Sequence, residues 1–178
     1  GSTMEGGMRV PMIVRWPGKI PAGTTSTELA TMMDLLPTFC ALTGAALPLK
    51  KLDGFDISEM LFRKGDEKSQ YEALYYYRRR QLQAIRYGDW KYHLPLKATH
   101  PNWTTAKQAG PGRSGKLVNL KSDLQEKTDV TAANPEVVKR MQELLKTAVV
   151  TLGNDDIRGD EQRDARTLDS SKPLTLKE

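Results

Sequence analysis

The sequence contains one cysteine, two histidines and no long apolar run. Because Cys40 is the only thiol, no disulfide bond can form within the chain. Its neighbours are apolar, which is typical of a buried helix residue, whereas a reactive thiol needs a basic and partly exposed setting. No stretch approaches the roughly 18 apolar residues of a membrane-spanning helix. The sequence therefore predicts no disulfide framework and no membrane partner.

An excess of one charge sign is also small: 27 basic and 22 acidic residues give a formal net charge of +5. Nucleic-acid binding usually requires basic residues gathered on one face. The densest basic cluster is Arg78, Arg79 and Arg80, and strand alternation would send neighbouring side chains to opposite faces. We expect a solvated surface here and no nucleic-acid partner, with a polyanion site as the alternative.

The 178 residues are 38% apolar and 28% charged, which is typical of a folded domain rather than a disordered chain. Residues 8–16 are rich in strand formers and end in Trp16-Pro17-Gly18, which predicts a buried strand. Residues 34–44 predict a helix with Asp34 as its N-terminal cap and Gly44 as its C-terminal cap. One apolar face of this helix would consist of Leu35, Leu36, Phe39 and Leu42.

The periodicity changes near Tyr71, after a loop and a short helix over residues 57–62. Residues 73–78, 82–86 and 90–94 predict strands, the last two joined by a tight turn at residues 87–89. A fourth strand is expected at residues 117–120, with residues 99–115 forming a surface loop. Connections this short favour antiparallel pairing.

The clearest helix is predicted over residues 135–151. Asn134 can cap it, Pro135 suits the first helical position, and Glu136 lies near the positive end of the helix dipole. We expect its apolar stripe to pack on the four-stranded sheet, and residues 153–178 to form an extended polar tail. The stripe consists of Val137, Val138, Met141, Leu144, Leu145 and Ala148.

Several motifs in a fixed order resemble those of the sulfatases. The later segments from Leu117 to Asp129 also resemble the stretch that precedes the C-terminal helix of that family. Any one of these motifs would be weak alone, but together they cover about residues 1–152. The motifs are Glu5-Gly6-Gly7-x-Arg9-Val10-Pro11, Arg15-Trp16-Pro17-Gly18, Asp34-Leu35-Leu36-Pro37-Thr38, Leu52-Asp53-Gly54 and Ala84-Ile85-Arg86-x-Gly88-Asp89-Trp90-Lys91.

The resemblance implies an α/β fold, an α+β fragment of an alkaline-phosphatase-like enzyme. Residues 1–68 would be the C-terminal end of the large α/β domain. Residues 69–152 would be a small domain, with a four-stranded antiparallel sheet packed by the helix at 135–151. The change of periodicity near Tyr71 gives the same division independently of the resemblance.

The resemblance also implies a formylglycine nucleophile made from a C/S-x-P-x-R motif and a bound calcium ion, both expected in the parent enzyme. Neither Cys40 nor any serine of this chain lies in such a motif. Asp53 and Asp56 are explained by turn and cap roles, and His93 and His100 lack ligand neighbours at suitable spacing. We therefore expect no catalytic residue, no metal ligand and no cofactor in this chain.

The family's sulfate-binding lysine would immediately precede Gly1. This places Gly1, Ser2 and Thr3 near the substrate of the parent, with Arg78 and His93 as further candidates, although a partly exposed strand position is the simpler interpretation of His93. Glu5 and Arg9 would anchor the loop. Gly1-Ser2 could instead be a cloning remnant.

The main hypothesis is the C-terminal part of a sulfatase whose parent hydrolyses sulfate esters and which is inactive alone. Its partner would be the missing N-terminal catalytic part, and apolar surface meant for that part would favour self-association. One alternative is a polyanion-binding module that uses Arg78, Arg79, Arg80 and Arg86, and another is part of a related phosphoryl transferase. The substrate, glycosylation at Asn102 and the compartment (periplasmic, secreted or lysosomal) stay open.

Overall fold

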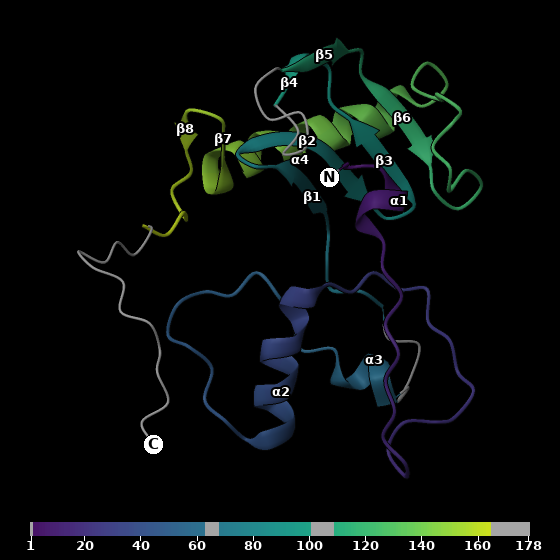
Figure 1. Cartoon of the computed structure of the whole chain (residues 1–178), viewed down its shortest axis with the longest axis vertical. Helices are drawn as coiled ribbons and strands as arrows, with labels where there is room; N and C mark the ends of the chain where they lie inside the picture. Colours follow the sequence, from purple (N-terminus) through teal and green to yellow (C-terminus); the bar gives the residue numbers. More distant parts are fainter. Residues whose placement is uncertain (1, 63–67, 101–108, 165–178) are drawn as a thin grey trace, which may run out of the picture.

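The computed structural model describes residues 2–62, 68–100 and 109–164. Its centre is a four-stranded sheet in the order β1-β2-β3-β6, in which all neighbours are antiparallel (Figure 1). The turn between the second and third strands uses Gly88, whose φ of 56° suits glycine. The strands are β1 (Leu74–Arg78), β2 (Gln81–Tyr87), β3 (Trp90–His93) and β6 (Lys116–Asn119). The four predicted strands and their antiparallel pairing are confirmed.

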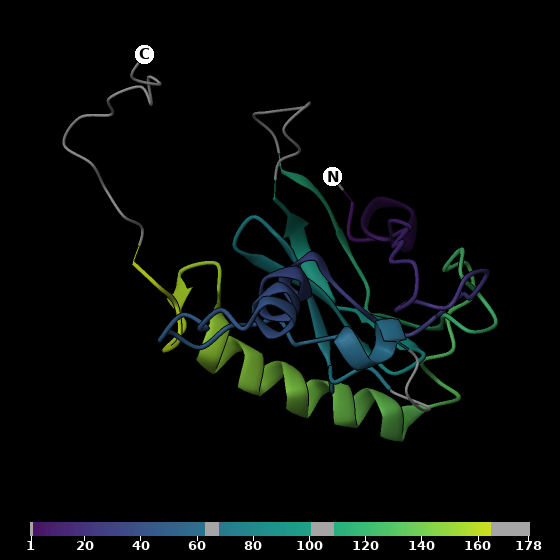
Figure 2. The ribbon, with the colours of Figure 1, turned by 90° about the horizontal axis from the view of Figure 1, so that it is seen from below.

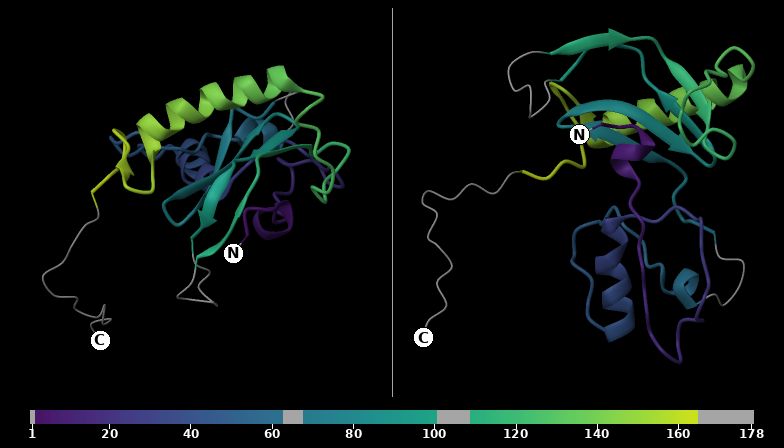
Figure 3. Two further views of the ribbon diagram at one scale, coloured as in Figure 1. Left: turned by 90° about the horizontal axis from the view of Figure 1, so that it is seen from above. Right: turned by 45° about the vertical axis from the view of Figure 1, so that its right-hand side comes forward.

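One face of this sheet packs on helix α4 (Pro135–Leu152). Leu82, Ile85, Tyr92 and Leu117 lie on this face. Side chains alternate between the faces of a strand, and Leu82 and Ile85, an odd number of residues apart, share one face because the β1–β2 register shifts between them. All four side chains meet the buried stripe of α4, which consists of Met141, Leu144, Leu145 and Ala148. Figure 2 and the left view of Figure 3 show α4 along this face, with α1 (Glu5–Met8) on the other.

Helix α4 begins as the sequence predicts, with Pro135 in its first turn and Asn134 before it. The side chain of Asn134 does not cap the helix. Its amide instead donates to the backbone oxygen of Val130 at 2.9 Å. Asn134 therefore fixes the approach of the preceding turn to the helix.

The outer edge of β6 is occupied by the turn that precedes α4. The backbone N–H of Leu117 donates to Thr131 Oγ1 at 2.9 Å and to Asp129 Oδ1 at 3.2 Å. The backbone oxygen of Leu117 accepts from the N–H of Val130 at 2.9 Å. Both backbone groups of this edge residue are thus satisfied within the chain.

The prediction of a strand at residues 8–16 is wrong. Residues 5–8 form the short helix α1, and residues 9–16 run without regular secondary structure. Their apolar side chains are exposed: Val10 is 72% and Ile13 95% accessible. A strand requires a neighbour to hydrogen-bond with, and no strand lies beside this segment in the part of the chain that the structure describes.

Helix α2 (Leu35–Thr43) confirms the helix predicted over residues 34–44, and Gly44 ends it with a φ of 74°. Asp34 acts differently from the prediction: a 3₁₀ turn (Met32–Asp34) precedes the helix, and Thr31 and Asp34 form the capping box of that turn. The expected apolar face is not buried, since Leu36 is 49% and Phe39 58% exposed. Pro37, Thr38 and Cys40 are buried instead.

A short helix and two small two-stranded pairs complete the described chain. Helix α3 (Ser58–Phe62) lies beside α2 in the lower part of Figure 1. Strands β4 (Leu96–Thr99) and β5 (Gly110–Arg113) form a ribbon where the sequence predicts a surface loop. Strands β7 (Gly153–Asn154) and β8 (Ile157–Arg158) form a small hairpin in the first residues of the expected polar tail.

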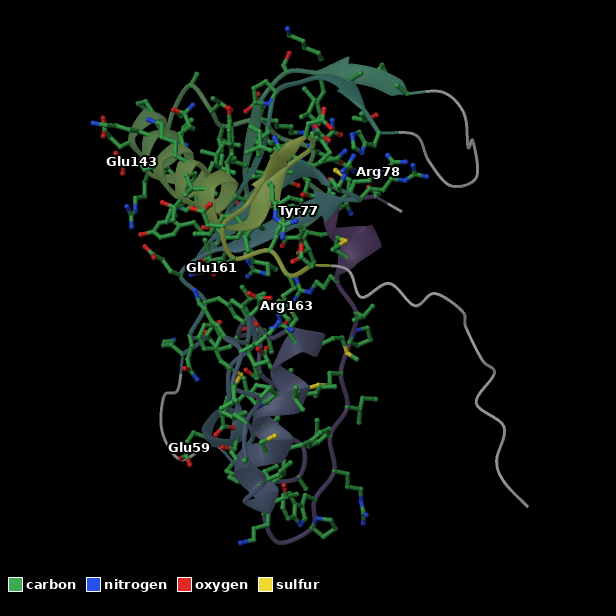
Figure 4. All side chains as sticks on the ribbon, turned by 90° about the vertical axis from the view of Figure 1, so that its left-hand side faces the viewer. Glu59, Tyr77, Arg78, Glu143, Glu161 and Arg163 are labelled. Atoms are coloured by element: carbon green, nitrogen blue, oxygen red, sulfur yellow. The ribbon has the colours of Figure 1, made fainter. Side chains whose placement is uncertain are left out.

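The β7–β8 hairpin docks on the turn between β1 and β2. Tyr77 donates to Gly153 O at 2.7 Å, and the N–H of Leu82 donates to Asn154 Oδ1 at 2.8 Å. Figure 4 shows Glu161 and Arg163 just beyond this hairpin, between the sheet layer and the part that holds α2. There Lys51 pairs with Glu161 at 2.8 Å, and Arg163 donates to Lys51 O at 2.7 Å. None of the helices over residues 2–62, 68–100 and 109–164 is long and apolar enough to cross a membrane.

Candidate functional site

The face of the sheet opposite α4 carries buried polar side chains. Lys91 and His93 alternate with Tyr92 on β3, so when Tyr92 faces α4 the other two point away from it. The side chain of Lys91 is 0% exposed, and His93 is 3% exposed. Buried lysines are rare unless they are paired with a negative charge, so a counter-charge must lie close to Lys91.

Lys91 lies between two carboxylates. Its Nζ is 2.8 Å from Glu5 Oε1 and 2.9 Å from Glu126 Oε1, and both glutamates are buried. The ring of Tyr76 lies 4.3 Å from the same ammonium group, a cation–π contact. Tyr76 also donates to Glu5 Oε1 at 3.3 Å. We call Glu5, Tyr76, Lys91, His93 and Glu126 the polar cluster.

Glu126 connects the other members of the polar cluster. Its Oε2 accepts the backbone N–H of Glu5 at 2.8 Å, and its Oε1 lies 2.9 Å from His93 Nε2. Burial alone would raise the pKa of Glu126, but the hydrogen bonds from Glu5, Lys91 and His93 outweigh this and lower it. The carboxylate is therefore held in its charged form.

His93 is buried in a neutral form. Burial lowers the pKa of His93 below its ordinary 6.5, and the charges of Lys91 and Arg113 add to this effect, against the opposing influence of Glu126. Because Glu126 accepts a hydrogen bond at Nε2, the neutral ring carries its proton there. The Nδ1 atom then has a free lone pair, and it has no hydrogen-bond partner within the described residues.

A chain of buried amides continues from the polar cluster toward the β1–β2 turn. Thr3 donates to Gln83 Oε1 at 3.3 Å, and Gln83 Nε2 donates to Gln81 Oε1 at 2.7 Å. Gln83 lies where the β1–β2 register shifts, which turns its side chain toward this face. Arg113 donates to the backbone oxygens of Gln83 and Leu94, the latter at 3.2 Å. The N-terminal segment is thus attached to the sheet through polar groups.

Only some of the site residues that the sequence analysis proposed lie at the polar cluster. Gly1 lies outside the described residues. Ser2 is exposed and its Oγ accepts from the N–H of Met4, while Thr3 is 4% exposed against the sheet. Arg9 is exposed, and its backbone N–H donates to Glu5 O. Arg78 ends β1 near the sheet's turn (Figure 4).

The interpretation of His93 as a partly exposed strand residue is wrong, because residues 3–8 and the turn at Glu126 cover its face of the sheet. Lys91, Glu126, Gln83 and Arg113 were not predicted. The alternation Lys91-Tyr92-His93 offered one signal, since two polar residues flank an aromatic residue that belongs to the core. Nothing in the sequence pattern indicates that a loop glutamate 35 positions after Lys91 reaches it.

Metal ligation and thiol chemistry find no support in the described ranges. No group of three or more His, Cys, Asp or Glu side chains in residues 2–62, 68–100 and 109–164 could hold a metal ion. Asp56 instead accepts the N–H of Ser58 at 2.9 Å at the start of α3. Cys40 is buried in α2. The residues described here do not fit a calcium site or a formylglycine nucleophile.

The four arginines of the alternative polyanion site do not form one patch. Arg78 pairs with Gln81 at the β1–β2 turn, whereas Arg86 pairs with Leu74 at the other end of the same strands. Arg80 lies 3.8 Å from Asp156 of the β7–β8 turn. The basic triplet is therefore separated from Arg86 and partly neutralised. Asn102 lies outside the described residues.

Comparison with known proteins identifies the family. Residues 3–151 match the family model described as "N-sulphoglucosamine sulphohydrolase, C-terminal". The chain belongs to this family. It is the C-terminal region of an arylsulfatase-type sulfatase, and the predicted resemblance is confirmed.

Relatives of this sulfatase region include human arylsulfatase A, which is 37% identical over 183 residues that cover 90% of this chain and 36% of the relative. Mouse arylsulfatase G is 53% identical over 64 residues, covering 35% of this chain and 12% of the relative. The chain thus spans about a third or less of these relatives.

Solved structures agree on the fold. A protein of glycosaminoglycan metabolism from Bacteroides thetaiotaomicron shares 31% identity with a TM-score of 0.65, over 81% of this chain and 30% of the other. The protein Ps i-CgsB shares 28% identity with a TM-score of 0.64, over 89% of this chain and 32% of the other. The mixed α/β arrangement with its four-stranded antiparallel sheet is therefore that of sulfatase C-terminal regions.

Acidification is expected to destabilise this sulfatase region in two steps. In the folded state the pKa of His93 lies below 6.5 and that of Glu126 below 4.5. At both groups the unfolded chain therefore takes up its proton at a higher pH than the folded chain, so the free energy of unfolding decreases as the pH falls. The loss begins below about pH 6.5 through His93 and increases below about pH 4.5 through Glu126.

Urea unfolding at a series of pH values between about 4 and 8 measures this dependence. The matched variant His93→Gln, which cannot titrate in this range, should lose the step that begins near pH 6.5. If the variant keeps the full slope between about pH 6.5 and pH 5, His93 is not the group responsible.

Proposed function

We propose that this chain is the C-terminal part of a sulfatase that hydrolyses sulfate esters when intact. The family match over residues 3–151 supports this, together with the sulfatase relatives, which are about three times as long. In this proposal the nucleophile and the calcium ion belong to the remainder of the enzyme, because the described residues offer neither a nucleophile motif nor a ligand group.

Residues 1–68 are proposed to end the large alkaline-phosphatase-like domain, and residues 69–152 to form the small domain, followed by the polar segment 153–178. The exposed apolar side chains support this division, because they concentrate in the first 49 residues. Surfaces of this kind mark interaction sites in soluble proteins. The side chains concerned are Val10, Met12, Ile13, Trp16, Leu36, Phe39, Leu47 and Leu49. We infer that the catalytic part of the sulfatase covers them, and that the chain alone self-associates through them.

The polar face of the sheet would form a wall beside the sulfate-ester site of the intact enzyme. Ser2 and Thr3 begin the segment that the polar cluster holds, and Gly1 precedes them. Arg78 and His93 are proposed to lie near the substrate in the parent enzyme, Arg78 with its positive charge and His93 as a buried neutral side chain behind residues 3–8. Their role would be to shape the site, and the bond-breaking groups would lie in the rest of the enzyme.

The test is sulfate release from an aryl sulfate such as a nitrophenyl sulfate. We expect the chain alone to release no sulfate above a blank without protein, because it lacks a nucleophile, and the intact sulfatase that contains it to be active. A C/S-x-P-x-R motif and a lysine adjoining Gly1 in the upstream coding sequence would identify that enzyme. Turnover by the purified chain would refute the division of roles proposed here.

A further inference from the structure

The segment of residues 2–9 is held on the sheet by polar contacts rather than by apolar burial. Thr3 and Glu5 are each 4% exposed, whereas Met4 is 37% and Met8 46% exposed. Helix α1 has four residues, far fewer than an isolated helix needs for stability in water. The position of this segment therefore depends on the groups that bind Thr3 and Glu5.

Glu5 is bound at two points by the polar cluster. Its backbone N–H donates to Glu126 Oε2, and its carboxylate accepts from Lys91, each at 2.8 Å. Lys91 in turn lies 2.9 Å from Glu126 Oε1, so the three groups close a triangle around one residue of the segment. Charge-assisted hydrogen bonds in a buried setting are stronger and more directional than exposed ones.

The backbone of Glu126 supports the same conclusion. Glu126 has a φ of 56°, in the left-handed region that residues with a Cβ adopt at a cost of about 1–2 kcal/mol. The ammonium group of Lys116 donates to the backbone oxygens of Glu126 at 2.6 Å and Lys127 at 3.0 Å. The turn is thus fixed in an unfavourable conformation that places the carboxylate under the segment. Conformations of this kind persist where the surroundings require them and cluster at functional sites.

We propose that Lys91 and Glu126 are positioning residues of the intact sulfatase. They fix residues 3–8 on the sheet, so that the residues at and before Thr3 keep one orientation toward the catalytic part. Neither residue contacts the substrate in this proposal. The inference rests on the proposed function, because it assumes that the N-terminal end of the segment borders the sulfate-ester site.

The first test uses the chain itself and measures hydrogen exchange at single amides. In Glu126→Gln, the side-chain amide must direct its NH₂ group either at Lys91 or at the N–H of Glu5, so one donor faces another. We expect exchange of the Glu5 amide to accelerate roughly 10- to 100-fold, as for loss of a hydrogen bond to a charged group. The amides of Leu94 and Val130, which bond to backbone oxygens of the sheet, should be unchanged.

Glu136→Gln is the matched control, since Glu136 is exposed in the first turn of α4. It should leave the Glu5 amide as in the original chain. If this amide stays protected both in Glu126→Gln and in Glu126→Ala, which removes the acceptor in either orientation, the segment is held by other contacts and the proposal is overturned.

The second test places Glu126→Gln in the intact sulfatase and measures kcat and KM on an aryl sulfate. Displaced groups at the reacting centre act on the chemical step, so kcat should fall about tenfold or more while KM changes little. A released Glu5 amide with unchanged kcat overturns the positioning role. If the unmodified intact protein releases no sulfate, the proposed function fails instead, and the amide measurement still shows whether Glu126 holds the segment.

Discussion

Replacing Lys91 with methionine is expected to lower the free energy of unfolding by about 3–5 kcal/mol, because it leaves buried carboxylates without their counter-charge. Glu5 and Glu126 would then face each other across an apolar side chain, and both are almost fully buried. Methionine keeps the length of lysine, so the change removes the charge with little change in volume. Urea unfolding followed by tyrosine and tryptophan fluorescence measures the loss.

Lys121→Met is the matched control, because Lys121 is exposed in the turn after β6. It should change the stability by less than about 0.5 kcal/mol. A triple variant with Glu5→Gln, Lys91→Met and Glu126→Gln should recover part of the loss, since it removes the uncompensated charges as well. Equal stability of the Lys91 and Lys121 variants would contradict a buried ion pair at the centre of the polar face.

Replacing Asp34 with alanine is expected to cost about 3–5 kcal/mol, since several buried donors lose their acceptor at about 1–3 kcal/mol each. Asp34 is 0% exposed. Its carboxylate accepts from the N–H of Thr31 at 2.5 Å, the N–H of Phe55 at 2.8 Å and the hydroxyl of Tyr71 at 2.6 Å. These contacts join the start of α2 to two segments more than 20 residues away, so their loss should release the part of the chain that contains α2.

Asp53→Ala serves as the control, because Asp53 is exposed in the neighbouring turn. Thermal unfolding and hydrogen exchange over residues 31–62 should separate the two variants. A second readout is the tyrosine hydroxyl: burial and the bond to Asp34 raise the pKa of Tyr71 well above its ordinary value of 10. In Asp34→Ala this pKa should fall toward that value. Identical melting of the two variants would show that Asp34 does not join these segments.

The sequence predicted correctly those elements whose apolar face packs on another element of the same chain. Strands β1, β2, β3 and β6 and helix α4 bury one another within the chain, so the alternation at Tyr92 and the stripe around Met141 are reliable. The strand expected at residues 8–16 and the buried face expected at Leu36 and Phe39 had the same apolar signal without a partner among the described residues. Periodicity records which face is apolar, and burial depends on what lies opposite.

The polar cluster escaped prediction for a different reason. A lysine in a strand is ordinarily an indication of a solvent-exposed position, and Lys91 is buried only because Glu5 and Glu126 approach it from 86 residues before and 35 residues after. Long-range charge pairing leaves no periodic signal in a single sequence. The ribbon of β4 and β5 was missed because Gly110, Pro111 and Gly112 are typical of a loop.

The two edges of the four-stranded sheet differ, because the edge at Leu117 is already hydrogen-bonded within the chain. The backbone N–H and oxygen of Leu117 bond to the turn at residues 129–131, and β1 is the strand at the opposite margin. Within the described part of the chain no strand pairs with the outer side of β1. A strand from another polypeptide that extends this sheet by hydrogen bonding can therefore add only at the edge formed by β1, beside its tyrosines. The turn at residues 129–131 blocks addition at β6, so the sheet cannot be extended at both edges.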